Sequence, residues 1–331
     1  MNEQNCSNAE LEKNILHKNI KDISDTLNFI HSKEKIKYFK KLENPSSLFS
    51  TFLILYLWSG IFIGWYLTAG IHFLFFPISI VIISINQRTL RNILHDASHN
   101  NLYSNQKLNE YLSNFFAGYP LFEKTKYFRK SHLAHHRYLG IKNKDPDFVF
   151  INELDPTQKK SCYQIYIMAI RNKKWLKSSN FGNLYYFNYK EILEVFFWWF
   201  IFLVTLIYIF SLKKVIIFLI LWFVSKATLY HFLKVFMEIS DHAGLEINGI
   251  IKSTRSMPNK LSSMIFFPFG DNYHLTHHLL PKIPTIKLRK AHKILIEWDN
   301  YQKACFPKRY FFGRKSVIMN WVIHRKKSDF T

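Results

Sequence analysis

The sequence predicts an all-α integral membrane protein with four transmembrane helices in two hairpins and a helical cytoplasmic cap. Two observations carry that prediction. Residues 45–87 contain no Asp, Glu, Lys or Arg, a run of 43 residues, whereas one helical crossing of the hydrocarbon core needs about 20 apolar residues. A second apolar region begins at Val195 and resumes at Val215, after Lys213 and Lys214. Each region is therefore long enough for two helices.

The first hairpin is predicted to turn at Thr68-Ala69-Gly70, between helices near 48–68 and 71–87. The fourth helix is predicted to extend beyond the membrane, because polar residues at 226, 230, 234, 238 and 242 are four apart and so form one stripe of one helix. The 28 residues from Val215 to His242 would span about 42 Å, against a hydrocarbon core of about 30 Å. We therefore expect His242 to stand below the membrane, at a depth similar to that of His95 on the second helix.

The distribution of basic residues predicts the topology. Of the 45 Lys and Arg residues, 8 lie in 1–44, 17 in 88–190 and 16 in 239–331. Because basic residues concentrate on the cytoplasmic side of membrane proteins, these segments, the histidine clusters within them and both termini are predicted to be cytoplasmic, at a bacterial inner membrane or, in a eukaryote, the endoplasmic reticulum. The predicted division is an N-terminal segment 1–44, a transmembrane hairpin 45–87, a cytoplasmic region 88–190, a second hairpin 191–238 and a cytoplasmic cap 239–331.

The composition excludes several classes of protein. The formal net charge of +22 is spread over segments that adjoin membrane helices, which favours contact with anionic membrane lipids and not with nucleic acid. The chain has three cysteines and no Cys-x-x-Cys, so a disulfide scaffold and a thiolate zinc site are both excluded. The polar first 44 residues predict no cleavable signal peptide.

Eight of the 15 histidines fall into three clusters. The first box has histidines four residues apart, and the second and third boxes both read His-x-x-His-His, a spacing that aims imidazoles at one point from one face of a helix. The composition would give about 0.03 such matches in a chain of this length, and two are present. The predicted metal ligands are His95, His99, His132, His135, His136, His274, His277 and His278, with His242 as the ninth.

Eight or nine imidazoles exceed what one ion can use, so the economical interpretation is two metals. Neutral imidazole suits iron, zinc, copper and nickel, so the spacing alone does not name the metal. A zinc hydrolase would use about three protein ligands, which would leave the other histidines unexplained. Several polar residues beside the boxes could orient the imidazoles. They could equally cap helices or form ordinary turns, and Glu238 could pair with Lys234. These residues are Asp96, Asp145, Asp147, Glu238, Asp241, Asp271 and Asn272.

Three histidine boxes arranged around two membrane hairpins resemble the membrane fatty acid desaturase/hydroxylase superfamily, over about residues 87–293. The resemblance includes His95-Asp96-Ala97-Ser98-His99, the Asp145-Pro146-Asp147 that follows the second box, and His277-His278-Leu279-Leu280-Pro281. It implies a non-haem di-iron centre, with two iron ions held by histidines, that uses O2 to remove hydrogens from an acyl chain. The leading hypothesis is a fatty acyl desaturase, with no catalytic residues beyond the metal ligands. An acyl-chain or lipid hydroxylase and a non-catalytic membrane metal-binding protein remain alternatives.

The expected partners follow from motifs that are absent. The sequence has no Gly-x-Gly-x-x-Gly, no Walker loop and no His-Pro-Gly-Gly, so neither a reductase nor a fused cytochrome b5 domain is predicted. Electrons are expected from an external donor such as ferredoxin, or cytochrome b5 with its reductase, and a basic surface suits such an acidic protein. The acyl substrate could be attached to a lipid, to CoA or to acyl carrier protein, and the sequence does not choose among them.

Overall fold

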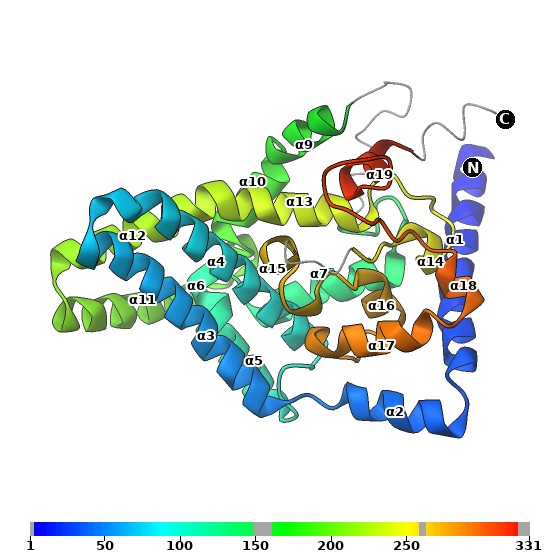
Figure 1. The fold of residues 1–331 in the computed structure, drawn as a ribbon, viewed down its shortest axis with the longest axis horizontal. Helices are drawn as coiled ribbons and strands as arrows, with labels where there is room; N and C mark the ends of the chain where they lie inside the picture. Colours follow the sequence, from blue (N-terminus) through cyan, green and yellow to red (C-terminus); the bar gives the residue numbers. More distant parts are fainter. Residues whose placement is uncertain (1–2, 148–160, 258–262, 324–331) are drawn as a thin grey trace. The chain divides into compact units, whose positions relative to one another are not determined.

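The computed structural model describes residues 3–147, 161–257 and 263–323 (Figure 1). These residues form helices and no strand, apart from two isolated β-bridges, so the predicted all-α class is confirmed. The chain divides into two compact units. Unit 1 comprises residues 1–44, 131–169 and 236–331, and unit 2 comprises residues 45–130 and 170–235.

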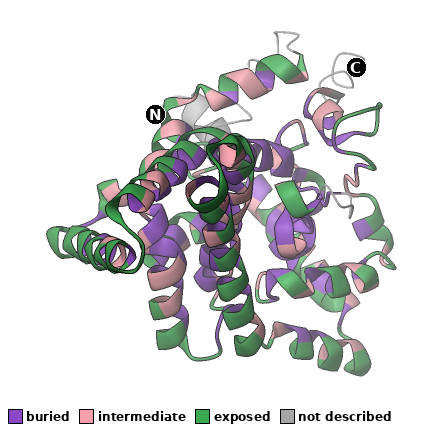
Figure 2. Ribbon diagram, turned by 60° about the vertical axis from the view of Figure 1, so that its left-hand side comes forward, coloured by how far each residue is buried: buried purple, intermediate pink, exposed green. Residues whose placement is uncertain are grey.

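Four helical stretches are long and apolar enough to cross a membrane, as predicted: Ser47–Ile71, Phe73–Ser98, Tyr189–Ile209 and Leu212–His242. Their surfaces carry exposed apolar side chains, such as Phe196, Phe200 and Tyr208 on α11. Exposed faces of this kind run along the long helices in Figure 2, and lipid is the solvent that suits them. The helices of unit 2 are α3 Ser47–Tyr66, η1 Leu67–Ile71, η2 Phe73–Phe75, α4 Phe76–Ser98, α5 Gln106–Ser113, η3 Asn114–Gly118, α6 Tyr119–Leu121, α10 Lys173–Phe181, η4 Leu184–Tyr186, α11 Tyr189–Ile209, α12 Leu212–Ser225 and η5 Lys226–Tyr230.

The first apolar helix ends later than the predicted turn at 68–70. A π-helical turn, η1, continues the helix to Ile71, and His72 then adopts an extended conformation with φ −160° and ψ 142°. The His72 ring accepts a hydrogen bond from the Leu74 N–H at 3.2 Å, so it caps the next helix. Thr68 of η1 and Ser79 of α4 share a hydroxyl hydrogen bond of 2.7 Å that joins these two elements. The turn is therefore set by a histidine cap, and Gly70 lies within the helix.

The fourth helix is continuous from Leu212 to His242, as predicted, but it contains a π-helical turn, η5, that the sequence did not predict. The first three residues of the polar stripe along it, Lys226, Tyr230 and Lys234, are buried. Lys226 is 1% exposed, and its ammonium donates to the Leu121 carbonyl at 2.7 Å. The Lys234 ammonium donates to Ser178 Oγ at 2.6 Å. Buried cations in an apolar helix are costly unless they are paired, and here a carbonyl and a hydroxyl accept their hydrogen bonds.

Unit 1 packs short helices around an apolar core. Phe39 and Leu42 of α2 share this core with Leu275 of α16 and with Leu288 and Leu295 of α17. The core therefore holds α16, which carries the third box, against α17, which lies beside it in Figure 1. The helices that lie in or enter unit 1 are α1 Glu3–Phe29, α2 Lys33–Glu43, α7 Thr125–Tyr138, α9 Cys162–Ile170, α13 His231–His242, α14 Ile250–Ser253, α15 Ser263–Phe266, η6 Pro268–Gly270, α16 His274–Leu279, η7 Thr285–Lys287, α17 Leu288–Leu295, α18 Asp299–Gln302 and α19 Val317–Ile323.

Candidate metal centre

The three boxes lie on or at the end of helices, as their spacing predicts. The second box lies on α7 and the third on α16, whose six residues are all buried. His95 lies in the last turn of α4, and His99 is the residue at its C-terminal cap. His242 is the last residue of α13. Because residues three or four apart share one face of a helix, each helix presents its imidazoles in one direction.

Four of these histidines converge within unit 1: His135, His242, His274 and His278. Each offers one ring nitrogen, and the four nitrogens lie within 4.8 Å of one another. The Nε2 atom of His278 lies 3.0 Å from Nε2 of His274 and 3.3 Å from Nε2 of His135. Nε2 of His242 lies 3.1 Å from Nε2 of His274. We call this group the four-histidine cluster.

The protons on the outer nitrogens show that the cluster fits a metal ion. His242 Nδ1 lies 2.9 Å from the Ser253 carbonyl oxygen, which can only accept, so Nδ1 carries the proton. His135 Nδ1 donates to the Asp145 carboxylate at 2.8 Å. With Nδ1 protonated, Nε2 of His242 offers a lone pair to the cluster, and Nε2 of His135 offers one when that ring is neutral. Ligand nitrogens about 2.1 Å from one ion lie about 3.0 Å apart at right angles and about 3.4 Å apart in a tetrahedron, and the observed separations match that range.

Asp145 is the main carboxylate beside the cluster. Besides His135, it accepts hydrogen bonds from the N–H groups of Gly140 at 3.0 Å and Asp147 at 2.9 Å. Burial raises the pKa of Asp145, but the interaction with His135 and the two N–H groups outweighs burial and lowers it. Asp145 is therefore ionised and holds the ring of His135 in one tautomer, as carboxylates do for metal-bound histidines.

The surroundings of His135 favour a positive charge. Burial lowers the pKa of His135, but the carboxylates of Asp145, Asp147 and Glu238 outweigh burial and raise it to about 9. By contrast, burial and the neighbouring rings of His136 and His274 lower the pKa of His278 well below its ordinary value. The site thus combines a neutral imidazole with carboxylates that attract a cation.

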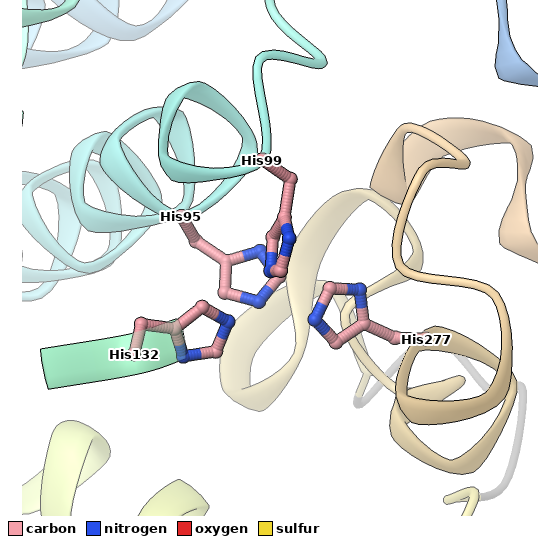
Figure 3. A group of neighbouring side chains, drawn as sticks. All are labelled: His95, His99, His132 and His277. Atoms are coloured by element: carbon pink, nitrogen blue, oxygen red, sulfur yellow. The ribbon is translucent and has the colours of Figure 1, made fainter. Parts of the chain in front are cut away.

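The other three candidate ligands of unit 1, His132, His136 and His277, form a second close group. Nε2 of His136 lies 3.1 Å from Nε2 of His132 and 2.9 Å from Nε2 of His277. The rings of His132 and His277, on α7 and α16, are stacked with centres 5.7 Å apart, and Figure 3 shows them facing each other. This arrangement again brings ring nitrogens to ligand spacing.

The first box belongs to unit 2. The rings of His95 and His99 project from the end of α4 toward the same side (Figure 3), and their centres lie 5.5 Å apart. Arg129 fixes this end of the helix, because its guanidinium donates to the carbonyls of Ala97 and Ser98, each at 3.0 Å. Burial and the charge of Arg129 lower the pKa of His99 to about 4, so its ring is neutral at pH 7 and able to bind a metal.

The other carboxylates predicted near the boxes lie at longer range. The carboxylate of Asp147 is 3.7 Å from His135 Nδ1, that of Asp96 is 3.8 Å from His95 Nδ1, and that of Asp241 is 3.8 Å from His274 Nε2.

The remaining predicted residues, Glu238, Asn272 and Asp271, make different interactions. Glu238 acts on the cluster through its charge on His135. The Asn272 amide instead donates to the Met257 carbonyl at 3.4 Å. Asp271 is buried, and its backbone N–H donates to Pro268 at 3.3 Å. Sequence reasoning missed the Ser253 carbonyl and Arg129, because neither contact belongs to a residue motif.

Comparisons with known proteins agree with this geometry. A family model described as fatty acid desaturase matches residues 71–311, a range that includes all nine candidate metal ligands. The chain is 27% identical over 246 residues to dihydrorhizobitoxine desaturase from Bradyrhizobium elkanii, a match that covers 69% of this chain and 70% of that protein.

Proposed function

The chain belongs to the fatty acid desaturase family, and from that premise we propose that it is an O2-dependent desaturase that introduces a double bond into a fatty acyl chain. The observation that supports the proposal is the four-histidine cluster, in which hydrogen bonds at Nδ1 of His135 and His242 leave their Nε2 atoms facing one point. We propose that all nine histidines bind two iron ions, four of them through this cluster. The other five are His95, His99, His132, His136 and His277.

Iron is the metal proposed because of the chemistry required. An unactivated methylene C–H bond is beyond acid–base catalysis by side chains, and bound iron with O2 supplies the oxidant that breaks it. One turnover removes two hydrogens from the acyl chain and, with two external electrons and two protons, reduces O2 to two molecules of water. The protein's own residues set the ligand geometry: the Asp145 carboxylate and the Ser253 carbonyl hold two rings with Nε2 inward.

Burial protects the reaction from water. His135, His274, His277 and His278 are each less than a tenth exposed, and a dry site suppresses side reactions of an oxidising centre. We further propose that the protein works in the membrane with its histidine boxes on the cytoplasmic side, and that ferredoxin or cytochrome b5 supplies its electrons.

The test is expression in a host with defined lipids, followed by mass spectrometry of the fatty acids for new double bonds and hydroxyl groups. The relative is named for dihydrorhizobitoxine, so that compound is included among the substrates. A new double bond together with two irons per purified chain is the expected result, and the His135→Ala variant serves as the inactive control. Hydroxylated products would show that the same site inserts oxygen, and metal binding without O2 consumption would identify a non-catalytic protein.

A further inference from the structure

The helix α17 has two faces of opposite character. Leu288, Ala291 and Leu295 are buried in the core that also contains residues of α16. Arg289, Lys290 and Lys293 are exposed on the other side. This sharp division is typical of a helix that covers a core on one face and meets solvent or a partner on the other.

Lysines from a second element crowd the same surface. Burial and the ammonium groups of Lys290 and Lys41, the latter on α2, lower the pKa of Lys287. The described acidic residues form no ion pair with Lys41, Lys287, Lys290 or Lys293. Their mutual repulsion is therefore not relieved within the described chain, and an anionic partner would relieve it. We call Lys41, Lys287, Arg289, Lys290 and Lys293 the α17 basic face.

A hydrogen-bonded path joins this face to the third histidine box. The His292 ring, between Lys290 and Lys293 on α17, lies 2.8 Å from the Tyr301 hydroxyl. That hydroxyl lies 2.7 Å from Thr276 Oγ1, and both Tyr301 and Thr276 are fully buried. Thr276 stands between candidate ligands on α16. One layer of helix, about 8–10 Å between axes, thus separates the basic face from the helix that carries three ligands.

This inference rests on the proposed function, which requires an external source of electrons. Each turnover takes one electron from each of two molecules of reduced carrier, which are oxidised, and these electrons, two protons and the two hydrogens of the substrate reduce O2 to water. We propose that the α17 basic face is the docking surface for an acidic one-electron carrier protein. An acidic carrier complements the positive charge of the α17 basic face. The hydrogen-bonded path through His292 and Tyr301 leads from the middle of that face to α16, which carries the third box.

Lipid headgroups are the competing occupant. The Lys287 ammonium donates to the Asn44 carbonyl at 2.5 Å, and Asn44 comes shortly before the first apolar helix, which begins at Ser47. Binding to lipid headgroups, however, requires only the positive charge of the face. It offers no role for the path from His292 to Thr276, and the carrier is therefore the occupant that accounts for both observations.

The test compares two double charge reversals in the full chain held in lipid nanodiscs. Lys290→Glu with Lys293→Glu alters the face, and Lys308→Glu with Lys315→Glu, at two exposed lysines of unit 1, is the matched control. Reduced [2Fe–2S] ferredoxin and cytochrome b5 are the two carrier probes. We expect the first variant to raise the KM for the carrier about tenfold at low salt and the control to change it less than about twofold. Iron content and melting temperature verify that both variants are folded.

A second readout does not depend on activity. Carbodiimide cross-linking of each carrier to the wild-type protein, mapped by mass spectrometry, should join carrier carboxylates to Lys290 and Lys293 and not to Lys308 or Lys315. A map without cross-links to Lys290 or Lys293 for either carrier would overturn the proposal, and so would equal effects of the two variants on KM. A KM that responds to the anionic lipid content of the nanodisc and not to Lys290 and Lys293 would assign the face to lipid. Absence of dithionite-driven turnover would instead count against the proposed function, and the cross-linking map would still decide the docking surface.

Discussion

Replacing Asp145 with Asn tests whether the four-histidine cluster binds metal through a fixed tautomer. The carboxylate accepts three hydrogen bonds, from His135 Nδ1 and from the N–H groups of Gly140 and Asp147. An amide has one accepting oxygen and one donating nitrogen. If its oxygen faces His135, its nitrogen meets the Gly140 N–H and that bond is lost. If its nitrogen faces His135, the ring must accept at Nδ1 and carry its proton on Nε2, where the metal would bind.

Either orientation of the introduced amide should weaken metal binding. Loss of a partner that orients a ligating histidine lowers metal affinity about 10- to 100-fold, which corresponds to about 1.4–2.7 kcal/mol. The assay is iron retained per chain after dialysis against a graded series of chelator concentrations. Asp147→Asn is the matched control, because its carboxylate is 3.7 Å from the same nitrogen and 40% exposed. It should shift retention less than about threefold, and equal shifts for the two variants would refute the tautomer argument.

Three further predictions concern other parts of the chain. His242→Ala should leave well below two irons per chain and remove desaturation, whereas loss of a helix cap would cost only about 1 kcal/mol of stability. The control is His17→Ala, at an exposed histidine. An active His242→Ala enzyme would contradict the ligand assignment. Gly244→Ala should destabilise the fold by about 2 kcal/mol or more, because φ is +74° and the new Cβ would lie 2.4 Å from the Trp321 carbonyl oxygen. Gly313→Ala, with φ +88° and no atom within 4 Å, should cost about 1 kcal/mol, and equal denaturation midpoints would refute the steric part. Cysteine labelling in intact cells should find both termini on the cytoplasmic side, and an external terminus would rule out four crossings.

What could be predicted from the sequence was local. The charge-free runs predicted the apolar helices, and four-residue spacing predicted that one helix would carry polar residues from Lys226 to His242. The grouping of ligands was not predictable. His132 and His135 are neighbours in one box, yet the four-histidine cluster includes His135 and not His132. That division depends on which helices pack together, and no spacing within a box records it.

The contacts outside the boxes show the same limit. Asp145 follows the second box closely enough in the chain to be a candidate, and it contacts His135. Asn272 was an equally good candidate by position, but its amide holds a backbone carbonyl. The Ser253 carbonyl could not have been proposed at all, because every residue type has a carbonyl and only the fold decides which one meets His242.

The way in which the four-histidine cluster is assembled affects the stability of unit 1. His135, His242 and the third-box histidines come from distant parts of the chain, and closing such loops costs entropy. The Nδ1 contacts with Asp145 and Ser253 hold the Nε2 atoms of His135 and His242 toward the other rings, and the second proton that His135 attracts at pH 7 must leave before a metal binds there. We expect a cation bound between the nitrogens to stabilise this arrangement, which would couple metal binding to the folding of unit 1. The contacts that orient the rings should therefore matter to the site as much as the ligands, because they aim the Nε2 atoms that a metal would bind.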